Sequence, residues 1–381
     1  MKKIFLIFHG RFPSEKAASL FAAKSCEAFA ELGSELVLLV PRRLKIDRNS
    51  PFKFYGVKEN FKIVYLPTID LFFIPWFSKI AFYLSYLAFS KVCFFYLLFE
   101  AKKEDIIYSN EILPLFFASF IFSNTFYELH DFPESKFSFC KKMFKRMKWF
   151  LTTNTWKMEK LKSTFGISSE KIILELNAVD IGEFNIDISQ EDARKKLSLP
   201  LDKKIIVYTG HLYRWKGVDT LVETGAFLNE DTLVYLVGGT EKDIERVKNL
   251  KSRGENIIIV GNRSHSEMPY WQKASDVFAL PNTAKEDISK YYTSPMKLFE
   301  YMASKRPIVA SNIPSITEIL NDTNSILVEP DDPKSLAEGI KKALEDFELS
   351  HNISEKAFED VQQHSWEKRA KKILDFIDNT A

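Results

Sequence analysis

Short apolar runs alternate with amphipathic segments along the first half of the chain. The run from Ile4 to Phe8 predicts a buried strand, residues 15–32 repeat apolar positions at helical spacing, and residues 35–40 form a second apolar run. Further strands are predicted at residues 62–66, 106–108, 125–129, 150–153 and 172–176. Strands separated by helices favour a parallel sheet that helices cover on both faces.

The same pattern restarts after a polar stretch at residues 185–201, where we place a hinge. Five apolar runs then end in Gly, Pro or Ser, at residues 205–210, 233–239, 256–261, 276–281 and 307–311. This is typical of a doubly wound α/β sheet, whose ligands bind at the carboxyl ends of the strands. We therefore predict an N-terminal domain at 1–185, a C-terminal domain at 201–355 and a last amphipathic helix within 356–381, clearest over 366–377.

The composition is that of an ordinary globular protein with two unequal halves. Hydrophobic residues make up 46% and charged residues 27% of the 381 positions, which argues against disorder and against a polytopic membrane protein. The net charge of +2 lacks the basic excess of a dedicated nucleic-acid binder. However, 26 of the 34 Phe lie in the first 150 residues, and 7 of the 13 Gly lie between Gly210 and Gly261.

The cysteines and the chain start indicate a reducing cytoplasm. Cys26, Cys93 and Cys140 form no C-x-x-C pair, so neither a disulfide framework nor a zinc site is expected. The run from Ile4 to Phe8 is shorter than a signal-peptide core.

The richest apolar stretch, Leu71 to Phe99, is interrupted by Pro75, Lys79 and Lys91. Because about 18 uninterrupted residues are needed to span a bilayer, we expect no full transmembrane helix there.

The most informative motif is TSPMKLFEYMASKRPIVAS at residues 293–311. Ser294 suits an N-cap and Pro295 the first helical position, so a helix is predicted from there to about Ser304. Its free N–H groups would offer an anion site, although simple capping explains the pair equally well. Glu300 lies further along that helix, where a carboxylate could accept the two hydroxyls of a ribose.

A second motif, GHLYRWKG at residues 210–217, directly follows a predicted strand. Glycines permit close backbone approach, and Arg214 with Lys216 supplies positive charge, which together suit a diphosphate. The motif is neither a Walker loop nor a G-x-G-x-x-G sequence. A solvated loop lysine is the alternative interpretation of Lys216.

The chain resembles the family 4 glycosyltransferases, which are retaining, nucleotide-sugar-dependent enzymes of GT-B fold. The resemblance rests on these two motifs together with ELHD at 128–131, ELNAVDIGEF at 175–184 and SWEKRAKKIL near the end. It implies two Rossmann-like domains facing across a cleft, the C-terminal one for the donor and the N-terminal one for the acceptor, with the last helix packing back on the N-terminal domain.

The resemblance also implies roles for individual residues. By matching position, Lys216 should bind the donor diphosphate, Glu300 the ribose hydroxyls, and the amides of Thr293 and Ser294 the phosphate or sugar. His130 matches the active-site histidine, although a histidine satisfied at a strand end is the bland alternative. The expected catalytic set is His130, Lys216 and Arg214, and the expected donor-binding set is Gly10, His211, Lys216, Asn262, Thr293, Ser294, Lys297 and Glu300.

Two positions depart from the family pattern. Many members carry Glu-x7-Glu, but Tyr292 stands where the first acid would be. His211 stands where many members have Arg, and we consider Arg214 the candidate to supply that charge.

The predicted chemistry needs no protein nucleophile. Positive charge develops at the anomeric carbon and negative charge on the leaving phosphate, so cations at the diphosphate stabilise the transition state. In a retaining transfer the leaving phosphate could itself take the acceptor proton. No metal-ligand cluster appears, and we expect the nucleotide sugar as donor substrate without a cofactor or a metal.

The acceptor is expected at the N-terminal half. Arg11, Ser14 and Lys16 begin the first helix, where they could hold a phosphate or a sugar hydroxyl, while helix capping is the alternative for Ser14. Residues 137–151 predict a basic amphipathic helix with Trp149 at its end, which either lies on an anionic membrane or packs on the sheet. We expect a saccharide or lipid-linked acceptor, no nucleic acid, and a cytoplasmic protein peripheral to the membrane.

Two other functions fit parts of the pattern. A two-domain sugar-nucleotide epimerase would need acid and base residues, of which His130 is the clear one. A non-catalytic nucleotide-sugar-binding protein would explain Tyr292 and His211.

Overall fold

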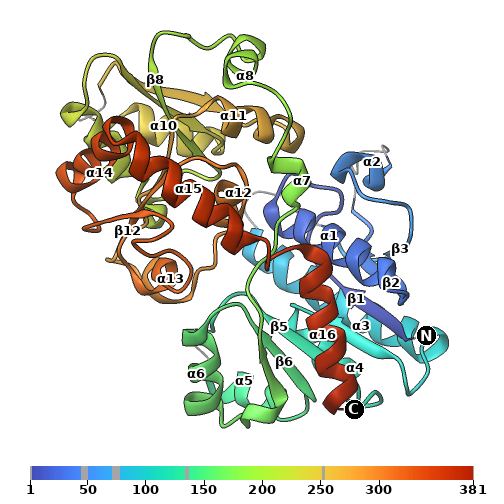
Figure 1. The fold of residues 1–381 in the computed structure, drawn as a ribbon. Helices are drawn as coiled ribbons and strands as arrows, with labels where there is room; N and C mark the ends of the chain where they lie inside the picture. Colours follow the sequence, from blue (N-terminus) through green and yellow to red (C-terminus); the bar gives the residue numbers. More distant parts are fainter. Residues whose placement is uncertain (1, 44–49, 71–77, 134–136, 251–253, 381) are drawn as a thin grey trace. The chain divides into compact units, whose positions relative to one another are not determined.

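The computed structural model describes residues 2–43, 50–70, 78–133, 137–250 and 254–380 (Figure 1). The chain divides into two compact units. The first consists of Met1–Leu176 together with Trp366–Ala381, and the second consists of Asn177–Ser365. Residues 185–201, where the sequence predicts a hinge, contain helix α8 (Gln190–Lys196). Arg194 of α8 donates a hydrogen bond to Asp276 Oδ2 at 2.7 Å, which fixes this stretch to the second unit.

The first unit is built on a seven-stranded sheet in the order β3-β2-β1-β4-β5-β6-β7, with every neighbouring pair parallel. The strands are β1 (Lys3–Ile7), β2 (Glu35–Pro41), β3 (Lys62–Leu66), β4 (Ile106–Ser109), β5 (Thr125–Leu129), β6 (Trp149–Thr152) and β7 (Ile172–Leu174). The direction of strand succession reverses between β1 and β4. In such sheets this switch point is where ligands bind.

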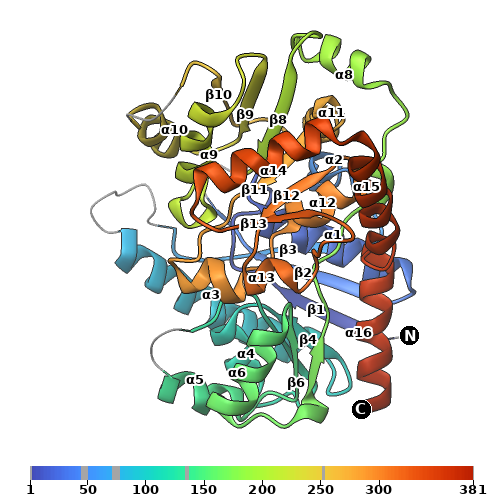
Figure 2. The ribbon, with the colours of Figure 1, turned by 60° about the vertical axis from the view of Figure 1, so that its left-hand side comes forward.

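Helices cover both faces of this sheet. They are α1 (Ala17–Glu31), α2 (Pro51–Tyr55), α3 (Ser78–Glu100), α4 (Ile112–Ala118), α5 (Phe137–Phe144), α6 (Thr155–Phe165) and α16 (Trp366–Thr380). Helix α16 packs on α1, while α3, α4, α5 and α6 contact one another in succession. Figure 2 shows α16 on one side of β1 and β4 and α3 with α4 on the other.

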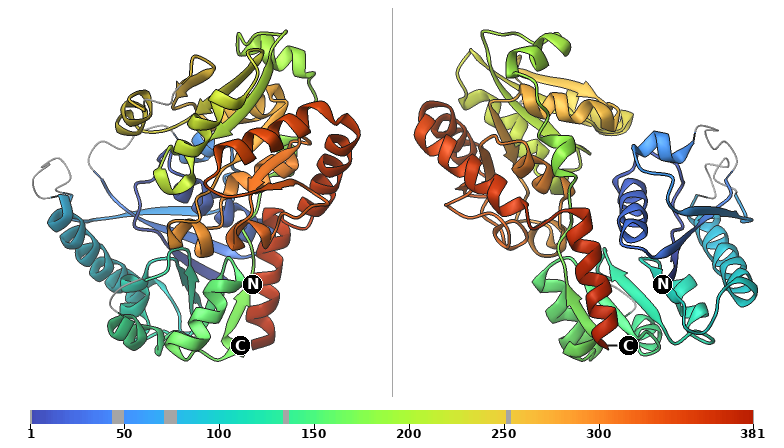
Figure 3. Two further views of the ribbon diagram at one scale, coloured as in Figure 1. Left: turned by 90° about the vertical axis from the view of Figure 1, so that its left-hand side faces the viewer. Right: turned by 45° about the vertical axis from the view of Figure 1, so that its right-hand side comes forward.

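The second unit repeats the design with six parallel strands in the order β10-β9-β8-β11-β12-β13. These are β8 (Lys204–Thr209), β9 (Thr232–Val237), β10 (Ile257–Gly261), β11 (Val277–Leu280), β12 (Ile308–Ser311) and β13 (Ile326–Val328). Its other helices are α7 (Ile181–Phe184), α9 (Val218–Thr224), α10 (Glu241–Lys248), α11 (Met268–Ala274), α12 (Met296–Ala303), α13 (Pro314–Thr317), α14 (Pro333–Glu345) and α15 (Phe347–Val361). The predicted pair of doubly wound parallel sheets is thus confirmed, and Figure 3 shows both from two further sides.

One detail of the sequence prediction is wrong. The basic helix predicted over 137–151 ends at Phe144, because residues 149–152 instead form strand β6, next to the edge strand β7. Trp149 is consequently a core residue that is 2% exposed, with the Lys148 ammonium 4.0 Å from its ring centroid. It cannot contact a membrane.

The structure describes part of the apolar stretch from Leu71 to Phe99. Residues 71–77 lie outside the described residues, but Ser78–Glu100 form one continuous helix, α3. Within the described residues, Ile80–Glu100 is a segment long and apolar enough to cross a membrane by length and composition. Lys91 lies within this helix, and the expectation that no full transmembrane helix forms there stays a prediction.

A buried ion pair attaches α16 to the first sheet. Arg369 of α16 donates from Nη2 to Glu128 Oε1 on β5 and from Nε to the Leu176 carbonyl at 2.9 Å. The two side chains are 2% and 1% exposed. Burial alone would raise the pKa of Glu128, but the charges of Arg369 and His130 lower that pKa to about 2. The end of the chain is therefore held by a charge pair that water does not reach.

We predict that Arg369→Ala lowers the free energy of unfolding of the first unit by about 3–5 kcal/mol, because it leaves the Glu128 carboxylate buried without its cation. Urea unfolding at pH 7 measures this loss. The pKa of Glu128 lies below its unfolded value of about 4.3, so the pair stabilises the protein above that pH. The loss should shrink as the pH falls toward 2.

Lys372→Ala is the matched control on the same helix. Its Nζ lies 3.0 Å from Glu175 Oε1, but the lysine side chain is half-exposed, so we expect a loss of at most about 1 kcal/mol. Equal losses in the two variants would contradict the role given to burial.

Candidate functional site

The carboxyl end of β8 is shaped by close backbone contacts that need glycine. Gly217 has φ +71°, and a Cβ there would lie 1.7 Å from the Pro281 carbonyl oxygen after β11. Gly238 has φ +123°, and a Cβ there would lie 2.4 Å from the Gly210 oxygen. The loop 210–217 is thus pressed between the ends of β9 and β11, at the switch point of the second sheet.

Lys216 ends this loop in a largely desolvated position. Burial lowers the pKa of its amine to about 8, against the opposing influence of the Asp243 and Glu300 carboxylates. An amine that loses part of its hydration gains more from an anionic partner than a solvated one does. Burial argues against the solvated-loop alternative for Lys216, and its binding of an anion stays a prediction.

A second lysine, Lys297 of α12, is buried beside it. Its Nζ donates to the Thr209 carbonyl at 3.0 Å and lies 3.3 Å from the ring centroid of Tyr208. Burial and then the charge of Lys216 lower its pKa well below the ordinary lysine value. Because Lys297 already bonds the last residue of β8, it holds α12 against that strand. The sequence analysis assigned Lys297 only to binding of the donor nucleotide sugar and did not predict this hydrogen bond within the protein.

Tyr301 makes the second tie between α12 and β8. Its hydroxyl accepts a hydrogen bond from the Thr209 amide at 2.7 Å, and its ring stacks on Phe278 with centroids 4.0 Å apart. Tyr301 is one of the site's supporting residues that the motif alone does not reveal, because its role depends on a strand 92 positions earlier in the chain.

Glu300 lies on the same helix with one identified support. Gln272 of α11 donates from Nε2 to Glu300 Oε2 at 3.2 Å. Burial raises the pKa of Glu300, and the nearby Glu183 carboxylate raises it further, while His265 and Lys297 act in the opposite direction. His265 and Glu183, which the sequence analysis did not select, form a pair at 3.1 Å. The carboxylate that could accept ribose hydroxyls thus sits among partly desolvated charges.

The remaining predicted donor residues are placed less centrally. Arg214 is 72% exposed, and its Nε lies 3.8 Å from Asp219 Oδ2. The His211 ring stacks on the Tyr213 ring with centroids 4.8 Å apart. Asn262 is exposed after β10. Tyr292, at the position of the missing acid, is buried at 5% exposure and is a packing residue.

The start of α12 differs from the prediction. The helix begins at Met296 with Pro295 as its N-cap, so Ser294 does not cap it. The Thr293 amide donates to the Ile288 carbonyl at 2.8 Å and is therefore already used within the chain. The Ser294 carbonyl accepts from Asn177 Nδ2 at 2.6 Å. These bonds remove the Thr293 amide from the expected phosphate contacts.

In the first unit His130 directly follows β5. Its Nε2 lies 3.0 Å from Glu128 Oε1, and the Phe21 ring packs edge-on against it with centroids 4.7 Å apart. The carbonyl of His130 accepts a hydrogen bond from Lys157 Nζ at 3.0 Å. Backbone and ring are both held, so the imidazole is fixed at the carboxyl end of β5.

Sequence reasoning missed a buried polar group beside Gly10. Arg43 after β2 donates from Nη1 to Ser85 Oγ at 2.8 Å and from Nη2 to the His9 carbonyl at 3.1 Å. Burial and the charge of Arg43 lower the pKa of His9 to about 3. His9 is thus neutral at physiological pH. Only the fold brings these three residues together, since up to 76 positions separate them in the chain.

The expected acceptor residues lie on the loop that follows Gly10. The Ser14 amide donates to Tyr55 Oη at 2.7 Å, and the Ser14 hydroxyl accepts from the Lys16 amide at 3.3 Å. Ser14 does not cap α1, because the N-cap is Lys16 and has no side-chain cap bond; the Ser14 hydroxyl instead closes a turn before the helix. Arg11 and Lys16 are exposed and could receive an anion.

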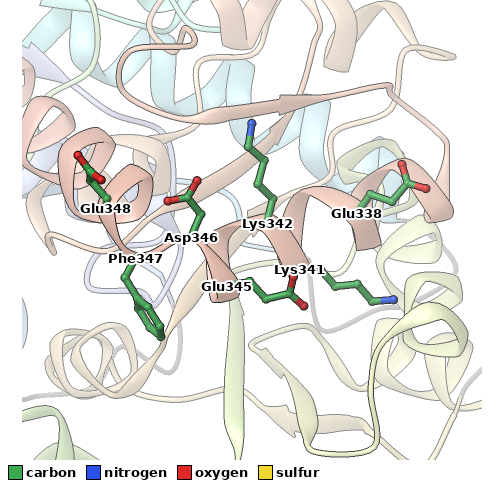
Figure 4. Close-up of a pocket in the computed structure, with 7 residues that line it drawn as sticks. All are labelled: Glu338, Lys341, Lys342, Glu345, Asp346, Phe347 and Glu348. Atoms are coloured by element: carbon green, nitrogen blue, oxygen red, sulfur yellow. The ribbon is translucent and has the colours of Figure 1, made fainter.

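Neither a metal cluster nor the pocket on α14 and α15 adds to the site within the described residues. In the part of the chain that the structure describes, no three His, Cys, Asp or Glu side chains gather in a way that could hold a metal ion. A pocket of about 720 Å³ lies on α14 and α15 (Figure 4). It is lined by residues of both charges, Glu338, Lys341, Lys342, Glu345, Asp346, Phe347 and Glu348. None belongs to the residues described above, and we regard this pocket as a solvated helix surface.

Comparison with known proteins agrees with this geometry. Residues 189–360, which include β8, the glycine loop and α12, match the family described as Glycosyl transferases group 1. The match places these residues, a little under half of the chain, within this family. An uncharacterized glycosyltransferase of Methanocaldococcus jannaschii is 26% identical over 225 residues, which are 57% of this chain and 56% of that protein. A D-inositol 3-phosphate glycosyltransferase of Corynebacterium urealyticum is 27% identical over 220 residues, 54% and 50% of the two chains.

The chain thus spans about half the length of the relatives that it matches in sequence. Solved structures match the chain over both units. Sucrose-phosphate synthase from Thermosynechococcus elongatus has a TM-score of 0.81 at 20% identity, covering 100% of this chain and 99% of its own. HepE of Anabaena in complex with UDP-glucose has a TM-score of 0.76 at 17% identity, covering 100% of both. These likenesses show that the fold is of the GT-B type.

We predict that Glu300→Gln keeps or raises the melting temperature at pH 7. The raised pKa means that the folded carboxylate is destabilised at every pH above its unfolded value, and a neutral amide of the same shape removes that cost. The advantage should vanish near pH 4, where the wild-type carboxyl is itself protonated. Thermal unfolding at both pH values measures it. A variant less stable at pH 7 but not at pH 4 would mean that the carboxylate supports the fold.

Proposed function

We propose that this protein is a retaining glycosyltransferase that moves a sugar from a nucleoside-diphosphate sugar to a saccharide or lipid-linked saccharide. The observation that carries the proposal is the set of Lys216, Lys297 and Glu300 at the switch point of the second sheet. Their charges act on one another in a desolvated region next to a glycine-rich loop. The family match covers these residues, and a structure of similar fold was solved in complex with UDP-glucose. We therefore propose a UDP-sugar as the donor.

The proposed roles follow from where charge develops. The Lys216 ammonium would neutralise the diphosphate as the bond to the anomeric carbon breaks, because a prearranged cation needs no reorganisation during the reaction. The Glu300 carboxylate would accept the ribose hydroxyls. Lys297 and Tyr301 would keep α12 at a fixed distance from β8 and so keep Glu300 in register with Lys216. Exposed Arg214 would act later, when a bound diphosphate gives it a partner.

His130 is proposed to lie beside the transferred sugar. The Glu128 carboxylate at 3.0 Å fixes its ring, which leaves the imidazole to hydrogen-bond a substrate hydroxyl. A leaving phosphate oxygen would take the acceptor proton on the same face of the sugar, so that the anomeric configuration is retained.

The acceptor class and the cellular location are also proposals. One relative is named for transfer to D-inositol 3-phosphate, and the exposed Arg11 and Lys16 would suit an acceptor that carries a phosphate. All three cysteines are free and buried, in keeping with the cytoplasm. We propose a role in making a surface polysaccharide or glycolipid at the inner face of the membrane.

The test of the donor site is the affinity for UDP as a function of pH. With a pKa of about 8, Lys216 is charged at pH 7 and largely neutral at pH 9, so affinity should fall about tenfold over this range. Lys216→Arg should bind with little pH dependence, because guanidinium stays charged. Lys216→Ala should bind about 10- to 100-fold more weakly at pH 7, the value of a charge-assisted hydrogen bond.

Isothermal titration with UDP measures these affinities, after a thermal-shift screen of UDP-, GDP- and ADP-sugars has identified the donor. If Lys216→Ala bound UDP with the affinity of the wild type, Lys216 would not belong to the donor site.

A second prediction separates binding from catalysis. His130→Ala should bind UDP with wild-type affinity but release nucleoside diphosphate in the presence of acceptor at least 100-fold more slowly, as is typical of a lost group at the reacting centre. His130→Asn is the conservative comparison. Full turnover in both variants would assign His130 to the ion-pair network of Glu128 alone.

A further inference from the structure

Helix α3 has two apolar faces, and its sheet-facing side accounts for only one of them. Along that side every fourth residue is fully buried, and these residues are Ala81, Ser85, Phe89, Cys93 and Leu97. The three larger ones pack with Phe5, Leu39 and Ile107 in the core of the first sheet. This stripe fixes α3 to the fold in the manner of any amphipathic helix.

The opposite side of α3 should therefore be polar, but it is not. Eight of its large apolar side chains are between 39% and 84% exposed, and they are Ile80, Phe82, Tyr83, Leu84, Leu87, Phe95, Leu98 and Phe99. Between residues 80 and 98 the sequence has one charged residue, Lys91. Exposed apolar side chains scattered singly are normal, but a continuous patch of this kind marks a contact surface.

Charged residues of both signs lie at this end of the patch. Lys91 on α3 and Lys102 with Lys103 just beyond it are exposed, and so are Glu100 and Glu104. Helix α4 contacts α3 and is followed by Phe120 and Ile121, which are exposed, and the Arg146 guanidinium covers the Phe120 ring at 4.0 Å.

The row of helices continues to α5, which contacts α4 (Figure 2). Phe139 of α5 is exposed beside exposed Lys141, Lys142 and Lys145. No acidic residue occurs between 137 and 148. Apolar side chains framed by lysines are the pattern of a helix lying in the headgroup region of an anionic bilayer, where the cations pair with lipid phosphates.

We propose that the outer face of α3, together with the ends of α4 and α5, docks on an anionic lipid bilayer, with α3 lying in the interface. The helix is long enough to span a membrane, but its inner stripe argues against a span. Crossing the bilayer would withdraw Phe89, Cys93 and Leu97 from the core of the sheet. An interfacial position leaves that core intact and covers the exposed stripe.

The same helix carries the His9 network on its inner side. The His9 ring lies 4.9 Å from that of Tyr86 and 5.4 Å from that of Phe89, and its Nε2 lies 3.3 Å from Ser85 Oγ. A bilayer on the outer face of α3 would thus lie one helix away from the loop of Gly10 and Arg11. If the proposed function holds, an acceptor sugar carried on a lipid is the class that this placement favours. The docking itself does not depend on that function.

The test is sedimentation of the purified full-length protein with vesicles of phosphatidylcholine alone and of an equal mixture with phosphatidylglycerol. We expect binding to the mixed vesicles, weak binding to the neutral ones and release by high salt. Phe99→Glu and Leu87→Glu should each weaken binding at least tenfold. Phe347→Glu is the matched control, because Phe347 is 74% exposed but lies on α15 of the second unit. It should bind like the wild type.

Several outcomes would overturn the proposal. Wild-type protein that stays in solution with mixed vesicles at low salt would do so, as would equal losses from Phe99→Glu and Phe347→Glu. A wild-type dimer in lipid-free buffer that Phe99→Glu dissociates would make a second copy the occupant of this face. Protein that remains in cell membranes after alkaline carbonate washing would indicate a span.

UDP titration of the same variants keeps the two proposals apart. Unchanged UDP affinity in Phe99→Glu shows that the variant is folded and that the donor site is intact. A wild type that binds vesicles but not UDP would refute the proposed function and leave the docking surface standing.

Discussion

Desolvation of charge at the carboxyl end of β8 is the constraint on which the second unit depends. Two amines and a carboxylate occupy a region where each loses hydration, and every ionised group there must be offset by a fixed partner. Lys297 is offset by the Thr209 carbonyl and the Tyr208 ring, and Glu300 by Gln272. Burial also lowers the pKa of Lys216, to about 8, against the opposing influence of the Asp243 and Glu300 carboxylates.

This constraint explains why the neighbouring backbone is rich in glycine. The cations can lie close to a ligand only if the strand ends and their loops lie close to one another, and at Gly217 the Pro281 carbonyl leaves no room for a side chain. The first unit solves a similar problem with side chains instead. There Glu128 is shared between Arg369 and His130, so the residue that anchors the last helix also orients the candidate catalytic imidazole. If His130 acts as proposed, this one carboxylate couples stability to the chemistry.

The sequence predicted the order and type of most elements because strand and helix periods are local signals. It missed β13, which has only three residues. It extended the basic helix into β6 because Phe144, Met147 and Leu151 continue the helical spacing of the preceding residues. Motif spacing also located Lys216 and Glu300. What it could not provide were bonds between distant segments. Three hydrogen bonds depend on tertiary packing. They join Lys297 to the Thr209 carbonyl, the Thr293 amide to the Ile288 carbonyl, and Arg43 to Ser85.

The surplus of phenylalanine in the first half does not by itself tell which phenylalanines are buried and which are exposed. Phe89 and Phe99 lie on the same helix and have the same chemistry, yet the first is fully buried and the second is 84% exposed. Whether a phenylalanine is buried depends on its position relative to the buried stripe, which recurs at every fourth residue and consists of Ala81, Ser85, Phe89, Cys93 and Leu97. A helix that is apolar all round has more apolar surface than one sheet can cover. The proposed bilayer contact would cover the remaining face of α3, and the lysines of α5 would face its anionic headgroups.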